Sequence, residues 1–587
     1  MPRATDKNMK MSSTNETIEA ADAAIRQGDF GRAEAILAKI NAEPARQTLP
    51  SLLLHSHTLG AQQKIPEAVA VLETAESRTR NPLEKAEILN RAADLLCNQP
   101  ETPRINIERA IGFLERSVTL VARSNNAVIR KNLCVLYYRL VDFKSVARHA
   151  KLLLKVPEFS VQANLWLAEA CFHFDERKKG ARHLEKASAH ANKLNEADLQ
   201  WLLGVLMNYG LHSQVQEIIN TAVSAGRQNP ALVRTQAQLS YKARDYEQAL
   251  EILSDEFISS HNQNMELTQS DFNLRGRCLD AMGRYVDAHK NFVAMNKVAR
   301  RSYPTTPGKD TAAAYAKVNL ASLPKHDIPE TIPYCPAFMV GFPRSGTTLL
   351  DTILDTQDEI TTLSEVAGLM AARDVMTTAG RDYPEDLSLL TEQDVDQLRN
   401  AYFAHNAQYL KPNNSYQVLI DKLPLNILHI PFIKILFPNA RFIFSLRHPL
   451  DVCLSCFQQG FLLNVEMLHF TDLEATFTRY RDVMNLFECF QSSGELNLLT
   501  VRYEDLVENF EATADEVFNF LNITPNESYK KFHEINKDKL LATPSSSQVV
   551  KPIYQSSRYR WHNYAEFLQP HIKIVQPFID KFGYSTT

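Results

Sequence analysis

The chain has 587 residues, of which 44% are hydrophobic and 22% are charged, so it is long enough for two or more folded domains. This composition excludes a largely disordered protein. The formal net charge of only −4 argues against binding nucleic acid or an anionic membrane through bulk charge, so any basic site is local.

The N-terminal stretch, residues 1–20, is polar and lacks the apolar core of a signal peptide, so we expect a flexible lead. The most apolar long stretch, residues 427–444, is interrupted by prolines and charged residues. It therefore falls short of the roughly 20 apolar residues that a spanning helix needs. We expect no membrane span and a cytoplasmic protein.

Residues 21–300 have a helical pattern in which a short turn recurs before an alanine-bearing helix. The turns include GDFGRA at 28–33, KIPEA at 64–68 and RDYEQA at 244–249. Equivalent points are spaced by 34 to 42 residues: Phe30, Ile65, Ile107, Phe143, Arg177, Leu211, Tyr246 and Tyr285. A period near 34 built from helix, turn and helix resembles tetratricopeptide repeats. The resemblance implies an all-α solenoid.

Stacked repeats present a concave face that commonly holds a protein or peptide, which is the partner we expect here. The alternative is that the solenoid only scaffolds or dimerises the C-terminal half. Residues 301–333 are rich in proline and predict a linker, with an alanine-rich piece at 311–318 that is short enough for one helix.

From residue 334 to 587 the pattern changes to short apolar runs that alternate with longer helical segments. The runs lie at 337–340, 416–420, 441–445 and 496–501. This alternation is typical of an α/β domain with a parallel sheet. Ligands bind at the carboxyl ends of the strands in such sheets, so we expect the chemistry in the polar clusters that follow these runs.

The first run leads into a glycine-rich loop in the sequence PAFMVGFPRSGTTLL, residues 336–350. It predicts a strand, a phosphate-binding loop and a helix, because the first amides of a helix have no partner within it and lie at its positive end. Gly341 and Gly346 have the spacing of a Walker A loop, but Thr347 stands where that loop has its lysine. The pattern indicates nucleotide binding and disfavours ordinary ATP hydrolysis.

A second anion site is predicted after the third run, in RFIFSLRHPLDVCLSCF at 441–457. Arg447 closes the strand, and Ser455 follows it by eight residues on the expected helix. An arginine fork and a serine hydroxyl can both bind one phosphate. Alternatively, Arg447 forms an ordinary ion pair with Asp451.

The loop PRSGTT and the later pair Arg447 and Ser455 together resemble the sulfotransferases, in particular the tyrosylprotein branch and its bacterial relatives fused to tetratricopeptide repeats. The resemblance extends over residues 334–564. It implies that 3′-phosphoadenosine 5′-phosphosulfate (PAPS) is the co-substrate and 3′-phosphoadenosine 5′-phosphate (PAP) the product. The loop residues that it assigns to the 5′-phosphosulfate are Pro343, Arg344, Ser345, Gly346, Thr347 and Thr348. Arg447 and Ser455 are assigned to the 3′-phosphate.

The same resemblance assigns four more residues. Glu365 matches the catalytic glutamate, and Lys422 matches a lysine that touches the transferring group. Tyr503 matches a residue beside the adenosine, and Lys551 matches a late lysine that closes over the nucleotide. The C-terminal segment SSRYRW at 556–561 lacks a glycine that is common in the bacterial relatives, and no copy of the animal enzymes' substrate-binding segment is found.

The chemistry of sulfuryl transfer fits these residue types. Charge builds on the leaving phosphate oxygen, so Arg344 and Lys422 can lower the barrier without a metal ion. A hydroxyl acceptor must lose its proton, for which Glu365 is the candidate base, best when partly buried. Structural alternatives are a helix-capping acid for Glu365, a surface lysine for Lys422 and a core aromatic for Tyr503.

The function predicted from the sequence is therefore PAPS-dependent transfer of a sulfuryl group to a hydroxyl, with protein tyrosine as one acceptor class. The alternatives are a P-loop kinase or NTPase and a non-catalytic repeat scaffold. Cys453 and Cys456 form a CxxC, but no second cysteine or histidine pair completes a zinc site, so we expect them to pack in a helix. The acceptor, the oligomeric state and the partner of the solenoid stay open.

Overall fold

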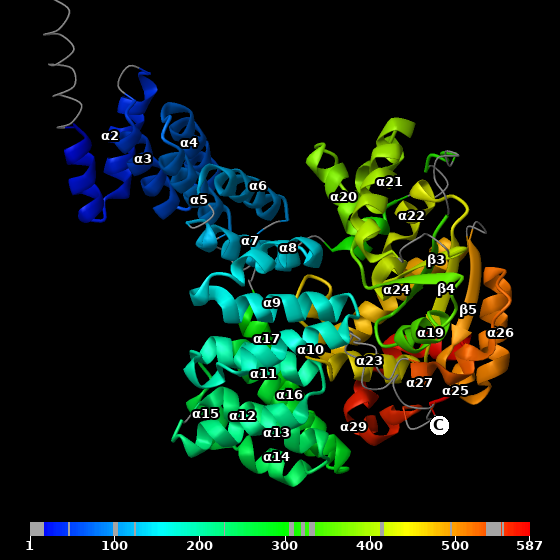
Figure 1. Cartoon of the computed structure of the whole chain (residues 1–587). Coiled ribbons are helices and arrows are strands. Elements are labelled where there is room, and N and C mark those ends of the chain that lie inside the picture. Colours follow the sequence, from blue (N-terminus) through cyan, green and yellow to red (C-terminus); the bar gives the residue numbers. More distant parts are fainter. Residues whose placement is uncertain are drawn as a thin grey trace, which may run out of the picture. The chain divides into compact units, whose positions relative to one another are not determined.

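The computed structural model (Figure 1) describes residues 17–44, 47–97, 102, 104–122, 125–227, 229–303, 310–318, 323–327, 335–410, 416–492, 496–535, 553 and 557–586. The chain divides into two compact units, Met1–Tyr209 and Gly210–Thr587. Most of the predicted N-terminal lead, residues 1–16, lies outside the described residues, and residues 17–26 form a helix. Among the described helices, none combines the length and the apolar character that crossing a membrane requires.

The first unit consists of helices that pack one after another along the chain. Its α-helices are α2 (Phe30–Ala42), α3 (Leu49–Ala61), α4 (Ile65–Arg78), α5 (Pro82–Cys97), α6 (Arg104–Leu120), α7 (Ala127–Arg139), α8 (Phe143–Leu153), α9 (Ser160–His173), α10 (Arg177–Ser188) and α11 (Glu196–Asn208). Their pairing in sequence order is what a repeat solenoid requires.

The predicted repeats are visible in the backbone of the turns. The second helix of most pairs begins two residues after a residue with positive φ, which ends the preceding helix in the left-handed conformation. These residues are Gly28, Gln63, Val141, Asp175, Gly210, Arg244 and Gly283. The expected equivalent points coincide with helix starts except in two repeats, where Ile107 lies inside α6 and Leu211 precedes the helix that begins at His212. The N-terminal half therefore fits a tetratricopeptide-repeat-like solenoid.

Small residues allow the paired helices to approach closely, as the sequence predicts. The recurring alanines Ala33, Ala68, Ala110, Ala249 and Ala288 are at most 1% exposed. A larger side chain at these positions would have to push two helices apart.

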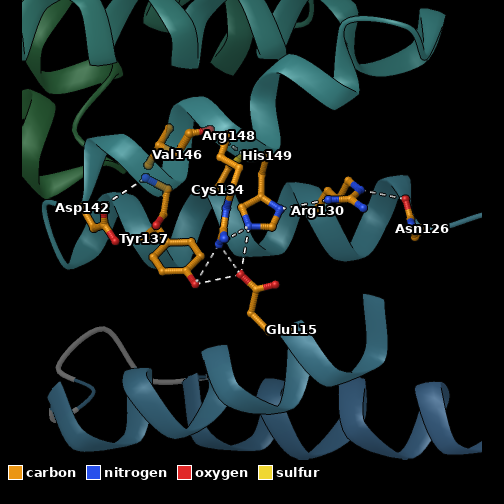
Figure 2. Close-up of polar contacts among 10 residues, drawn as sticks. Glu115, Asn126, Arg130, Cys134, Tyr137, Asp142, Val146, Arg148 and His149 are labelled. Carbon is orange, nitrogen blue, oxygen red and sulfur yellow. Dashed lines mark hydrogen bonds and ion pairs between the residues drawn. The ribbon is translucent and has the colours of Figure 1, made fainter. Parts of the chain in front are cut away.

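A buried polar cluster joins three successive helices, α6, α7 and α8 (Figure 2). The Glu115 carboxylate accepts hydrogen bonds from the Tyr137 hydroxyl at 2.8 Å and from Arg148 Nη2 at 2.6 Å. His149 Nε2 lies 3.0 Å from the same carboxylate, and its Nδ1 lies 3.2 Å from Arg130 Nη1. Burial lowers the pKa of the His149 imidazole. The cluster thus connects one repeat to the next through the His149 side chain.

The second unit begins with further helices of the repeat pattern and continues into the α/β half. The helices of its repeat part are α12 (His212–Ser224), α13 (Pro230–Lys242), α14 (Tyr246–Ile252), α15 (Asp255–Ser260), α16 (Met265–Ala281) and α17 (Tyr285–Ser302). Those that follow are α18 (Thr311–Tyr315), α19 (Thr347–Leu354), α20 (Gly368–Thr378), α21 (Glu392–Asn406), α22 (Ile430–Leu436), α23 (Pro449–Phe457), α24 (Leu473–Ser492), α25 (Tyr503–Glu508), α26 (Phe510–Leu521), α27 (Phe532–Ile535), α29 (Ala565–Leu568) and α30 (Ile572–Lys581). The predicted linker, residues 301–333, contains α18.

A five-stranded sheet in the order β2-β3-β1-β4-β5 forms the centre of the α/β half. The strands are β1 (Ala337–Gly341), β2 (Ile360–Ser364), β3 (Val418–Lys422), β4 (Arg441–Leu446) and β5 (Asn497–Arg502), and all pair in parallel. The predicted parallel sheet is confirmed, and the four apolar runs correspond to β1, β3, β4 and β5. Strand β2 was not predicted, because it lies at the sheet edge and its sequence, ITTLS, has no apolar run.

Helices cover both faces of this sheet. On β1, Phe338 and Val340 face one core, and Ala337 and Met339 face the other, as alternation along a strand requires. The first of these cores also contains Phe292 and Met295 of α17. The last helix pair of the repeat region therefore shares a hydrophobic core with the α/β half.

Candidate functional site

The loop between β1 and α19 is shaped by two glycines that no larger residue could replace. A Cβ atom at Gly341 would lie 2.6 Å from the Ser445 carbonyl oxygen, so the loop can pass β4 only without a side chain. Gly346 has φ of 98°, and a Cβ there would lie 2.6 Å from Cδ2 of Tyr503. The loop therefore passes close to β4 at Ser445 and to the first residue of α25, Tyr503.

The N-terminus of α19 faces the pocket with Thr347 and Thr348 in its first turn. Gly346 is its N-cap, and among the described residues no side chain caps it. The first amide groups of a helix have no partner within the helix, so this end can bind an anion.

Arg344 lies in the loop and is partly buried. Its Nε donates to Ser455 Oγ at 3.1 Å, and its carbonyl oxygen accepts from Arg447 Nη1 at 3.1 Å. Burial lowers the pKa of the Arg344 guanidinium to about 10, which still leaves it charged at neutral pH. The loop and the predicted second anion site are thus joined directly.

Arg447, which follows β4, has neighbours on several sides. Its Nη2 donates to the Ser557 carbonyl at 2.5 Å and lies 3.6 Å from Asp451 Oδ2, while its Cζ lies 4.8 Å from the ring centre of Tyr503. Its Nε is buried and has no hydrogen-bond partner among the described residues. The predicted alternative, an ion pair with Asp451, is therefore present.

Glu365 directly follows β2, and Lys422 ends β3. The Lys422 Nζ lies 3.1 Å from Glu365 Oε1 and 3.7 Å from Asp351 Oδ2 of α19. The lysine side chain is 0% exposed, whereas that of Glu365 is 38% exposed. Burial raises the pKa of Asp351, whose Oδ2 accepts a hydrogen bond from the Ser364 hydroxyl. Lys422 thus connects the carboxylate of Glu365, which lines the pocket, to the carboxylate of Asp351 on α19.

One pocket collects most of the predicted site residues. Its lining includes Pro343, Arg344, Gly346, Thr347, Thr348, Glu365, Arg447, Ser455 and Tyr503. Ser345 and Lys422 are buried beside the pocket without lining it, and Lys551 lies outside the described residues. Helix α23 lines the pocket with positions 451, 454 and 455, which are spaced by three or four residues and therefore lie on one face of the helix. Position 458, just beyond the end of the helix, continues this face.

The sequence reasoning missed several residues of this site. Asp451 accepts the backbone N–H groups of Tyr559 at 2.7 Å and Trp561 at 3.0 Å, and so binds the C-terminal segment to α23. Arg560 of that segment lines the pocket. Asp351 could have been suspected, because it follows Thr347 by four residues and so lies one turn further along α19. The contacts of Asp451 carry no local sequence signal.

The predicted packing role of Cys453 and Cys456 agrees with their position in α23, where both are buried free thiols. Burial raises the pKa of both. Within the described part of the chain, no group of three or more His, Cys, Asp or Glu side chains is arranged to hold a metal ion.

Known proteins have sequences similar to part of this chain. Residues 336–527 match the model of the sulfotransferase family. An uncharacterized protein of Aquifex aeolicus is 27% identical over 246 residues, which is 41% of this chain and 32% of that protein. The putative protein-tyrosine sulfotransferase of Caenorhabditis briggsae is 25% identical over 256 residues, which is 43% of this chain and 89% of that protein. The chain thus spans about a third of the first relative.

Solved structures resemble parts of this chain at low overall similarity. The sulfotransferase domain of a Synechococcus olefin synthase has a TM-score of 0.33 and 22% identity, covering 45% of this chain and 99% of that one. A tetratricopeptide repeat protein of Parabacteroides merdae has a TM-score of 0.32 and 17% identity, with the same coverage of 45% and 99%. The similarity to the sulfotransferase family thus lies in residues 336–527, which follow a helical region whose turns recur as in tetratricopeptide repeats.

Proposed function

We propose that this protein is a sulfotransferase that uses PAPS and transfers its sulfuryl group to a hydroxyl acceptor. The observation that carries the proposal is the link between two anion sites in one pocket. Arg344 of the loop bonds Ser455, and Arg447 bonds the loop carbonyl of Arg344. A ligand with two phosphate-type groups, such as PAPS, fits such a pair better than a nucleotide with a single phosphate chain.

The residues around the pocket suit the parts of this co-substrate. The uncapped N-terminus of α19, with Thr347 and Thr348, would hold the 5′-phosphosulfate. The guanidinium of Arg447 and the hydroxyl of Ser455, two residues that line the pocket, would hold the 3′-phosphate. Tyr503 would lie beside the adenosine, and Lys551 keeps its predicted role of closing over the nucleotide.

The chain has a side chain that can accept the proton of the acceptor hydroxyl and another that can stabilise the charge on the leaving oxygen. The acceptor oxygen forms a bond to sulfur as the bond from sulfur to the 5′-phosphate oxygen breaks, and PAP leaves with the charge. Glu365 takes the proton of the acceptor hydroxyl, and the Arg344 guanidinium stabilises the charge on the leaving oxygen. Lys422 would orient the Glu365 carboxylate through their ion pair and add positive charge beneath the reacting groups.

The names of several relatives favour a tyrosine hydroxyl as one acceptor class, which we include in the proposal. A protein or peptide bound by the solenoid, or a homodimer organised by it, remains a proposal as well. The cytoplasmic location, the absence of nucleic-acid partners and the absence of a catalytic metal stay predictions of the sequence.

Calorimetric titration tests the co-substrate directly. The full chain is titrated with PAP in the absence of metal ions and, separately, with ATP plus magnesium. Micromolar binding of PAP together with weak binding of ATP is the expected result. The reverse result would favour a P-loop kinase or NTPase, and binding of neither would favour a repeat scaffold.

A further inference from the structure

The last repeat pair, α16 and α17, contacts the end of the helix that lines the pocket. Three side-chain amides donate to main-chain carbonyls there. Asn296 Nδ2 bonds the Phe457 carbonyl at 2.9 Å, and Asn273 Nδ2 lies 3.3 Å from that of Gln458. Gln269 Nε2 lies 3.3 Å from the carbonyl of Phe461.

These bonds satisfy groups that α23 cannot satisfy itself. The last carbonyls of a helix have no partner within it, so α16 and α17 act as an external cap for α23. Asn296 is only 3% exposed, and its amide is therefore committed to this contact. The backbone passes close to α16 as well, because a Cβ at Gly460 would lie 3.6 Å from both Asn273 and Met295.

The capped segment forms the pocket wall that is farthest along α23 from Arg447. Arg447 precedes α23, Ser455 lies in its last turns, and Gln458 and Phe461 follow its end, all lining the pocket. Met467 continues this wall, and Leu462, between Phe461 and Met467 in the sequence, is 80% exposed. Phe461 and Met467 line the pocket without belonging to either anion site, so the proposed function leaves this wall to the acceptor.

We propose that α16 and α17 hold this acceptor-side wall, residues 457–467, and that Gln269 and Asn273 are positioning residues for acceptor binding. The inference rests on the proposed function, because that function assigns Arg447 to the nucleotide. The repeat region is then part of the catalytic unit and sets how the acceptor is received. Partner binding on the last repeat would change acceptor affinity through the same contacts.

A second contact makes a selective test feasible. Asp280 of α16 accepts a hydrogen bond from the Tyr564 hydroxyl at 2.7 Å and pairs with Arg560 at 2.5 Å. His289 of α17 stacks on Phe567 with ring centres 3.9 Å apart. These contacts keep the repeat pair docked when the amides of Gln269 and Asn273 are removed.

The test compares the double variant Gln269→Ala/Asn273→Ala with the full native chain and with Ser270→Ala. Ser270 is exposed on the same helix, so its substitution controls for unspecific effects. Hydrogen exchange is followed at the amides of Gln458, Gln459 and Phe461, which bond to Leu454, Cys456 and Gln459. PAP affinity is measured by calorimetry, and turnover of PAPS is measured with 4-nitrophenol and with a tyrosine-containing peptide.

We expect exchange in this segment to become at least about tenfold faster, since the wall loses two of the four hydrogen bonds that α16 and α17 donate to it. The KM for the acceptor should rise severalfold, while kcat and PAP affinity stay within about twofold, and Ser270→Ala should match the native chain. Unchanged exchange or unchanged acceptor KM would overturn the inference. A parallel loss of PAP affinity would also overturn it, because the contact would then support the whole pocket. A native chain that binds no PAP would instead refute the proposed function and the acceptor assignment with it.

Discussion

Arg344 and Glu365 share a backbone feature that is costly for residues with side chains. Their φ angles are 71° and 57°, in the left-handed region that favours glycine. Strain of this kind, of order 1 kcal/mol or more, persists only where the surrounding structure enforces it, and it concentrates at functional sites. For Glu365 the enforcing contact is its N–H, which donates to the Lys422 carbonyl at 2.7 Å. Arg344 and Glu365, which are proposed for charge stabilisation and proton transfer, therefore have a backbone conformation that the surrounding structure enforces.

Replacing Glu365 with glutamine separates catalysis from binding. The amide keeps the size of the side chain but cannot take a proton, so we expect turnover to fall by about 10²- to 10⁴-fold. PAP affinity should change by no more than a fewfold, because the residue would face the acceptor. Stopped assays of sulfuryl transfer and calorimetry with PAP give the two values. Unchanged turnover would eliminate Glu365 as the base.

Replacing Arg447 with alanine should have the opposite profile. Loss of a hydrogen bond to a charged group should weaken PAP binding by about 1.5 to 3 kcal/mol. Adenosine 5′-phosphosulfate, which lacks the 3′-phosphate, should bind the native and variant chains almost equally. If instead both nucleotides lose the same affinity, Arg447 supports the pocket structurally through Ser557 and Asp451. Calorimetry with the two nucleotides distinguishes these results.

At the scale of elements, the repeats and the buried strands were predictable because their signals are local. A recurring turn before an alanine, as at Ala249, needs only sequence spacing to be seen. Strand β2 could not be predicted from its local sequence, because ITTLS has no strand pattern of its own. Its pairing with β3, which follows some 55 residues later, makes it a strand. The same limit applies to Asp451, whose partners Tyr559 and Trp561 come from the end of the chain. Long-range contacts leave no periodic trace in the sequence.

The polar cluster between α6, α7 and α8 predicts a pH dependence of stability. His149 faces Glu115, Arg130 and Arg148 and stacks on Tyr137, and burial lowers the pKa of its imidazole in the folded state. Below its unfolded pKa of about 6.5 the unfolded chain binds the extra proton more readily, so stability falls as pH decreases. Each pH unit below 6.5 should cost up to about 1.4 kcal/mol until the folded pKa is reached.

The variant His149→Gln tests whether His149 causes this pH dependence of stability. The glutamine keeps hydrogen-bonding capacity but does not titrate, so the loss of stability between pH 7.0 and 5.5 should become smaller than in the native chain. Thermal unfolding monitored by circular dichroism at both pH values measures the difference. Other histidines whose pKa is lowered, such as His55 and His173, act with the same sign and give the residual slope. Equal slopes in the two chains would show that His149 does not titrate in this range.

At the scale of the whole molecule, the position of a deletion decides whether the transferase half survives. The sequence pattern places the end of the solenoid near residue 300, whereas the second compact unit begins at Gly210. Ala288, Phe292 and Met295 of α17 share a core with the α/β half, and Asn296 and Asp280 bond α23 and the C-terminal segment. Removing residues 1–209 should therefore leave a folded protein that binds PAP within about threefold of the full chain. Removing residues 1–300 would expose that core and uncap α23, so we expect loss of PAP binding and aggregation on gel filtration. If the shorter fragment binds PAP as well as the longer one, the last repeat pair is dispensable, and the solenoid ends functionally at the boundary that the sequence predicts.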